Sequence, residues 1–158
     1  MAILEERRSI IRVKIYLDTC SIQRPLDSKN QIRILLEADA VLGIIVLCDA
    51  GGAELVSSDA LLYETQRNPH SIRKNHAMAI LEKANVMIKL DDIIEKRAKS
   101  FVAEGIKPLD ALHLASAEAA QADYLCTCDD RFLNKANQLS DLSVQVVTPV
   151  YLVEELDL

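Results

Sequence analysis

The sequence Lys107-Pro-Leu-Asp-Ala-Leu-His-Leu-Ala-Ser-Ala117 predicts a buried helix with an acid at its start. Pro108 suits the first helical position, where a missing N–H costs nothing, and leucine and alanine recur after it at helical spacing. Asp110 falls in the first turn, where the helix dipole favours a carboxylate. That placement alone fits an ordinary first-turn acid. Asp110 becomes a candidate site residue because other acids stand at the ends of predicted strands, on the side from which this helix starts.

On both sides of this helix, strand-like segments alternate with helical ones. Predicted strands cover residues 10–17, 54–57, 86–90, 124–128 and 144–147. Predicted helices cover residues 31–49, 58–67, 71–84, 91–104 and 129–137, a turn covers 19–22, and a helical turn follows 148–149. This alternation predicts an α/β fold with a mainly parallel sheet. A length of 158 residues suits one domain over residues 1–158.

The composition limits the partners and the location that we expect. A net charge of −6 and a pI near 5.1 exclude a generally cationic nucleic-acid surface but allow a local basic patch. Charged residues at 5–8 do not suit a signal peptide. Arg33, Glu37 and Asp39 interrupt the most apolar stretch, 32–48, which is then too short to span a bilayer. We therefore expect a soluble, cytoplasmic protein without membrane contact.

The four cysteines predict neither a disulfide scaffold nor a zinc site. They are too sparse for a scaffold, and thiols stay reduced in the cytosol. The pair in Cys126-Thr-Cys128 lacks both the CxxC spacing and a second pair of ligands. On a strand, the two thiols of this pair would point the same way.

Four acids are placed where a parallel sheet binds its ligands. Asp18 ends the first predicted strand, Asp129 follows the strand at 124–128, and Glu64 lies in the helix after the second strand. Such sheets bind ligands outside the carboxyl ends of their strands, so these acids and Asp110 can converge. Asp129 also suits a plain helix cap, and Glu64 suits a solvated helix position. Asp18 is the hardest to dismiss, because it directly ends a buried strand.

Carboxylates that gather in one crevice repel one another and need a cation to neutralise them. Ligand sets made only of oxygen suit hard cations such as Mg²⁺ or Mn²⁺. Such a cation activates water and stabilises the leaving oxygen in phosphodiester hydrolysis. The acids therefore favour a metal-dependent hydrolase.

Four short motifs follow one another along the chain. They are Tyr16-Leu-Asp18-Thr-Cys, Ser57-Ser-Asp-Ala-Leu-Leu-Tyr-Glu64, Leu109-Asp110-Ala-Leu-His113-Leu-Ala and Ala122-Asp-Tyr-Leu-Cys-Thr127-Cys-Asp129. In this order they resemble the PIN domain, the fold of ribonuclease toxins in bacterial toxin–antitoxin pairs. Each motif is weak alone, but the order and spacing hold over nearly the whole chain. One departure is Cys20, because the family commonly has asparagine two residues after the first aspartate.

The resemblance implies a three-layer α/β/α domain with a twisted, mainly parallel sheet of four to five strands. It implies a toxin-type endoribonuclease that hydrolyses single-stranded RNA with Mg²⁺ or Mn²⁺, held directly or through water by Asp18, Glu64, Asp110 and Asp129. It also implies a homodimer and an antitoxin that blocks the site. The predicted helix at 31–49 agrees with an interface, because it is apolar on more sides than one core contact requires. Asp130 could compete with Asp129, but the Thr-x-Asp register favours Asp129.

Several neighbours of the acids are candidates for supporting roles. His113 lies three residues after Asp110, and we favour a packing or hydrogen-bonding role for it over chemistry. Thr19 and Thr127 can orient acids or waters through their hydroxyl groups. Substrate phosphates need cations, and the candidates, which could equally be ordinary surface arginines, are Arg24, Arg67 and Arg131.

Other functions fit the sequence less well. A phosphatase or receiver domain that uses Asp18 would want a second acid two residues later, where Cys20 stands. A dinucleotide-binding fold would need G-x-G-x-x-G after the first strand, and the chain has none there. A catalytically weak PIN-like module that binds RNA or protein is the alternative that remains. The presence of all four acids argues against it.

Overall fold

A computed structural model describes residues 12–158 as an α/β fold built on one sheet. Five strands pair in the order β3-β2-β1-β4-β5, and each pair is parallel. The predicted parallel sheet of four to five strands is therefore confirmed. The strands are β1 Lys14–Leu17, β2 Glu54–Ser58, β3 Val86–Ile88, β4 Tyr124–Cys126 and β5 Gln145–Val147.

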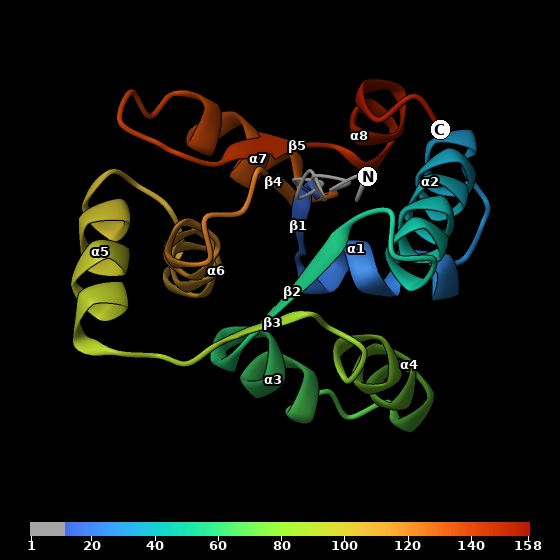
Figure 1. Ribbon diagram of the computed structural model, residues 1–158, viewed down its shortest axis with the longest axis horizontal. Coiled ribbons are helices and arrows are strands. Elements are labelled where there is room, and N and C mark those ends of the chain that lie inside the picture. The colour runs from blue at the N-terminus through green and yellow to red at the C-terminus, as the bar shows by residue number, and fades with distance from the viewer. Residues whose placement is uncertain (1–11) are drawn as a thin grey trace, which may run out of the picture.

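Helices cover both faces of the sheet, which confirms the three layers. Figure 1 shows α2 and α8 on one side of the central strands and α5 and α6 on the other. In sequence order the helices are α1 Thr19–Gln23, the 3₁₀ turn η1 Arg24–Leu26, α2 Ile32–Asp49, α3 Asp59–Gln66, α4 Ser71–Leu81, α5 Asp92–Ala103, α6 Pro108–Ala119, α7 Asp130–Asn137 and α8 Pro149–Glu155. Within residues 12–158, no helix is long and apolar enough to cross a membrane.

The central strand β1 organises the core and sets the position of the site. Ile15, Tyr16 and Leu17 are fully buried, as expected for a parallel sheet that is covered on both faces. From β1 the chain passes to β2 on one side and later returns to β4 on the other side. Ligands of open α/β sheets bind at such a reversal of strand order, outside the carboxyl ends of the strands. In this chain that point lies just after β1 and β4.

Two local predictions were wrong. The segment 19–22, predicted as a turn, belongs to helix α1, because the Asp18 carboxylate caps it and accepts a hydrogen bond from the Ser21 N–H at 3.0 Å. The strand predicted over 124–128 ends at Cys126, so Cys126 and Cys128 do not share a strand. Both cysteines are buried near the Ser21 hydroxyl, at 3.9 and 3.7 Å.

The other differences are shifts of element ends. The first strand, predicted over 10–17, begins at Lys14, and residues 10 and 11 lie outside the described residues. The predicted strand at 86–90 ends at Ile88, and the predicted helix at 71–84 ends at Leu81. None of these shifts moves an acid of the candidate site to another element.

Candidate active site

Asp18 lies at the carboxyl end of β1, where it caps α1. It is 4% exposed, and besides the Ser21 N–H its Oδ1 accepts a hydrogen bond from the Cys20 thiol at 3.1 Å. Burial raises the pKa of the Asp18 carboxyl, and hydrogen bonds from Thr127 and Cys20 partly oppose that rise. Asp18 is thus a buried carboxylate whose ionised form a bound cation would stabilise.

Glu64, in the second turn of α3, is held by a chain of buried polar groups. His113 Nε2 lies 3.2 Å from Glu64 Oε2, and His113 Nδ1 lies 2.6 Å from the Tyr16 hydroxyl. The Tyr16 hydroxyl lies in turn 2.6 Å from Ser58 Oγ. Ser58 caps α3 by accepting the Leu61 N–H at 3.1 Å. This chain joins β1, β2, α3 and α6 beneath the site.

The donors and acceptors of this hydrogen-bonded series, from Glu64 to Ser58, follow from the state of Tyr16. Burial raises the pKa of Tyr16 well above its ordinary value of 10.0, so its hydroxyl keeps its proton. With Tyr16 as the donor, His113 Nδ1 accepts the hydrogen bond, and Nε2 carries the hydrogen that faces Glu64. Burial acts to raise the pKa of Glu64, but His113 and the Thr19 hydroxyl outweigh it and the pKa is lowered. The chain therefore keeps Glu64 ionised and fixed in orientation.

Asp110 lies in the first turn of α6 and is half-buried. Its pKa rises to about 6, first through burial and then through the negative charge of Asp18, with smaller contributions from Asp129 and Glu64. The carboxyls of Asp18, Asp129 and Glu64 therefore each lie within electrostatic range of Asp110.

Asp129 and Asp130 face different partners. Asp129 caps α7, and its Oδ1 accepts the N–H groups of Arg131 and Phe132 at 2.9 and 3.2 Å. Its own N–H donates to Thr127 Oγ1 at 3.1 Å. The Asp130 carboxylate instead receives two hydrogen bonds of 2.7 Å from the Arg33 guanidinium of α2. Asp129 is therefore the acid that lies beside Asp110, in agreement with the Thr-x-Asp register.

The two threonines differ in their contacts. The Thr127 hydroxyl accepts from Asp129 and lies 3.6 Å from the Cys20 thiol, so it stands between the loops that follow β1 and β4. The Thr19 hydroxyl is buried and makes no hydrogen bond of acceptable geometry within residues 12–158. It nevertheless lies close enough to Glu64 to lower the pKa of that carboxyl. A buried hydroxyl without a partner beside an acid is a position for a water or a ligand oxygen.

The three predicted phosphate-binding arginines have different surroundings. Arg24 forms ion pairs with Asp27 and Glu37 at 3.0 and 3.1 Å, so its charge is already neutralised. Arg67 lies over the Tyr63 ring at 5.0 Å. Arg131 alone among the three lines a pocket with candidate acids.

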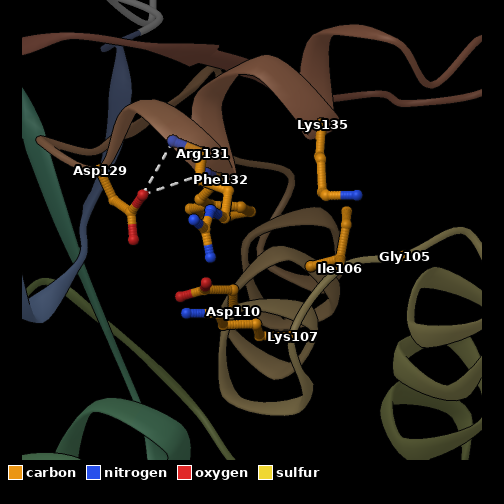
Figure 2. Close-up of a pocket in the computed structure, with 8 residues that line it drawn as sticks. All are labelled: Gly105, Ile106, Lys107, Asp110, Asp129, Arg131, Phe132 and Lys135. Atoms are coloured by element: carbon orange, nitrogen blue, oxygen red, sulfur yellow. Dashed lines mark hydrogen bonds between the residues drawn. The ribbon is translucent and has the colours of Figure 1, made fainter.

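This pocket lies between the start of α6 and α7 (Figure 2). It has a volume of about 200 Å³. Asp110 and Asp129 lie at one end of it, and the Arg131 side chain extends from α7 towards Asp110. Sequence reasoning missed the two lysines in its wall and also the Tyr16–Ser58 pair. The remaining lining residues are Gly105, Ile106, Lys107, Phe132 and Lys135.

The donor set fits a hard cation, although the donors are not drawn together. Within the part of the chain that the structure describes, no three His, Cys, Asp or Glu side chains are close enough to share a metal ion. The four acids offer only carboxylate oxygens, and the unpartnered Thr19 hydroxyl adds another oxygen beside them. Burial and then the charge of Asp18 raise the pKa of Asp110, and a bound divalent cation would offset both effects by stabilising the ionised carboxylate.

A family model for the PIN domain matches residues 15–138. The chain belongs to the PIN domain family. The match contains β1 except for Lys14, all four acids and the pocket, so the candidate site lies inside the PIN domain. No curated protein matches the chain.

Solved structures share the fold of this PIN domain at low identity. One is a chain in the crystal structure of VapBC2 from Rickettsia felis bound to a DNA fragment from their promoter, with a TM-score of 0.57, 14% identity and coverage of 86% of this chain and 98% of that one. Another is VapC20 from Mycobacterium tuberculosis, described as a Sarcin-Ricin loop cleaving toxin, with a TM-score of 0.53, 16% identity and coverage of 80% and 97%. A protein from Pyrobaculum aerophilum matches with a TM-score of 0.52, 15% identity and coverage of 93% and 98%.

Proposed function

We propose that this PIN domain is a toxin-type endoribonuclease that hydrolyses phosphodiester bonds of single-stranded RNA with the help of Mg²⁺ or Mn²⁺. The observation that carries the proposal is a pocket that Asp110 and Asp129 line together with cationic side chains, with Asp18 and Glu64 within electrostatic range of Asp110. Family membership and the toxins among the fold neighbours support the same function.

Asp18, Glu64, Asp110 and Asp129 would hold the cation, directly or through water. When bound, the cation would supply activation of water and stabilisation of the leaving oxygen. Asp18 is held in place by the Ser21 N–H of α1, and Asp129 by the Arg131 and Phe132 N–H groups of α7. The contact of His113 Nε2 with Glu64 Oε2, at 3.2 Å, helps to keep Glu64 ionised and in place. The buried Thr19 hydroxyl, which faces Glu64, can orient a water.

The organisation of the protein is part of the proposal. We propose a single domain over residues 1–158, a cytoplasmic location and a homodimer that is inhibited by an antitoxin. Two fold neighbours come from toxin–antitoxin systems, which supports the antitoxin. The exposed apolar side chains of α2, which support an interface, are Ile32, Leu35, Leu36, Leu42 and Val46.

Cleavage of a labelled single-stranded RNA tests the proposal. We expect cleavage with Mg²⁺ or Mn²⁺, none in excess EDTA, and none for Asp18→Asn or Asp110→Asn with unchanged circular dichroism. Asp92→Asn, which changes an exposed first-turn acid of α5 outside the site, is the matched control and should cleave as the wild type does. Full cleavage in EDTA would refute the metal-dependent mechanism.

One observation favours the alternative, a catalytically weak PIN-like module that binds RNA or protein. Within residues 12–158 the acids do not share a ready-made ligand cluster. Calorimetric titration with Mg²⁺ and Mn²⁺ separates the two functions. The nuclease should bind the metal and lose that binding in Asp18→Asn, whereas a module without a metal site gives no heat.

A further inference from the structure

The pocket of Figure 2 gathers positive charge in an acidic protein. Three cationic side chains line it. Arg131 and Lys135 belong to α7, and Lys107 directly precedes α6. The chain as a whole carries a net charge of −6. A local concentration of cations on such a protein points to an anionic ligand.

These three cations have no carboxylate within salt-bridge distance among residues 12–158, unlike four of the seven arginines in that range. The paired arginines in the same part of the chain are Arg24, Arg33, Arg73 and Arg97. Lys107, Arg131 and Lys135 therefore keep their charge for a ligand, even though Asp110 and Asp129 line the same pocket.

The pocket has a direction. Asp110 and Asp129 lie at one end of the pocket, and the Arg131 side chain extends towards Asp110 (Figure 2). Lys135 lies at the other end, by Ile106 and Gly105. Gly105 has φ +97°, and a Cβ there would lie 3.0 Å from Lys135 Nζ, so the glycine lets the ammonium group approach this wall. Lys135 is thus too far along the pocket to serve the acids themselves.

The wall between the charges is apolar. Ile106 and Phe132 are each 3% exposed, and both line the pocket. Cations beside an aliphatic and an aromatic surface suit a nucleotide, whose phosphate binds the cations while its base or ribose contacts the apolar wall. A free inorganic anion has no apolar part that could contact this wall.

We propose that this pocket is a subsite for the nucleotide next to the scissile phosphate of single-stranded RNA, with Lys135 binding the flanking phosphate. This inference rests on the proposed function, because it places the cut beside Asp110 and Asp129. Arg131 lies between the two positions and contacts the phosphate nearer the acids. An unpaired strand is required, because a base held in a duplex cannot turn into a pocket of this kind.

RNA binding without cleavage tests the subsite. The substitution Asp18→Asn, which lies outside the pocket, is introduced into the full chain to prevent cleavage. Binding of a fluorescent single-stranded RNA is then measured by anisotropy at several salt concentrations. Adding Lys135→Ala should weaken binding about three- to tenfold and reduce the slope of log affinity against log salt by about 0.7, the value for one lost phosphate contact on a single strand. Lys135→Arg should retain most of the binding.

The matched control is Lys83→Ala, which removes one positive charge from the end of α4, away from the pocket. It should leave binding unchanged, and equal losses for Lys83→Ala and Lys135→Ala would overturn the subsite. If the wild type cleaves RNA but Lys135→Ala binds like the control, the subsite is wrong and the nuclease stands. If RNA binds through Lys135 but the wild type never cleaves it, the pocket binds RNA, but the nuclease, and with it a subsite beside a scissile phosphate, is wrong.

Discussion

Replacing Asp110 by asparagine should make the metal-free protein more stable. The folded protein holds Asp110 half-buried beside Asp18, and both effects disfavour its charge. Asparagine keeps the shape and the ability to form hydrogen bonds but removes the charge. Function therefore holds the metal-free fold below the stability that it can reach.

The magnitude follows from the pKa. A rise from the ordinary 3.8 to about 6 corresponds to about 3 kcal/mol between the ionised and neutral forms. Because solvent screens a half-buried group and asparagine also loses the favourable helix-dipole interaction, we expect a net gain of about 1–2 kcal/mol. For a protein of this length, that gain raises Tm by about 2–8 °C.

The sign of the pH dependence is fixed by the same pKa. The folded state holds its proton more tightly than the unfolded state, so stability falls as pH rises from about 4 to about 6 and the cost is complete above that range. The gain of Asp110→Asn should thus be full at about pH 8 and vanish at about pH 3.5. Saturating Mg²⁺ should then stabilise the wild type more than the mutant. At a Mg²⁺ concentration of about a hundred times the Kd of the wild type, binding stabilises the wild type by about 2.7 kcal/mol.

Thermal unfolding of the wild type, Asp110→Asn and Asp92→Asn in EDTA and in Mg²⁺ measures these effects. Asp92 is an exposed first-turn acid of α5, so its replacement should cost a few tenths to about 1 kcal/mol through the helix dipole. If Asp110→Asn lowers Tm at about pH 8 as Asp92→Asn does, and Mg²⁺ affects neither protein, the acids do not form one site.

Three further predictions concern other parts of the molecule. Tyr16→Phe should cost about 1–3 kcal/mol in urea unfolding and weaken Mg²⁺ binding, because His113 loses its donor and Glu64 its fixed partner; Tyr63→Phe, at an exposed tyrosine, is the control. Zn²⁺ or Cd²⁺ should inhibit RNA cleavage through the Cys20 thiol, which lies 3.1 Å from Asp18 Oδ1, and Cys20→Asn should relieve the inhibition; equal inhibition of both proteins would count against this contact. Sedimentation should show a homodimer that Val46→Glu on α2 dissociates, and a monomeric wild type at high micromolar concentration would contradict it.

Element order and the place of the acids could be predicted because both depend on local patterns. Caps marked the helix starts, and Asp91 and Thr148 act in the structure as helix caps should. The alternation of strands and helices predicted the parallel sheet, and a parallel sheet brings the carboxyl ends of its strands to one edge. An acid at the end of a strand could therefore be assigned to that edge from sequence position alone.

Helix α1 could not be predicted, because tertiary contacts decide it. Its five residues contain a β-branched threonine and a serine, which are weak helix formers. The helix forms because Asp18 caps it and because Ser21 and Ile22 are fully buried against the sheet. The Ser21 hydroxyl also donates to the Cys126 carbonyl at 3.0 Å, across 105 positions of sequence. No pattern in the neighbourhood of residue 19 contains that contact.

The network below the acids was out of reach for the same reason. Tyr16 and His113 are 97 positions apart, and their hydrogen bond exists only once α6 packs against β1. A tyrosine in a fully buried strand was a usable signal, because a buried hydroxyl must find a partner. The partner itself, however, is chosen by the packing. The ion pairs of Arg24 and Asp130 with residues of α2 likewise form only once α2 packs in place.

The acids of the site differ in pKa, and this difference couples metal binding to the loss of a proton. Glu64 is kept ionised by His113, whereas Asp110 has a pKa of about 6 and holds its proton in part of the molecules near neutrality. A carboxyl must lose its proton before it binds a cation, so binding near that pH releases a proton. Mg²⁺ affinity should therefore fall as pH drops through about 6, and Asp110→Asn should abolish the proton release. Calorimetry in two buffers of different ionisation enthalpy measures the released proton directly. Equal heats in both buffers at that pH would show that Asp110 does not bind the metal.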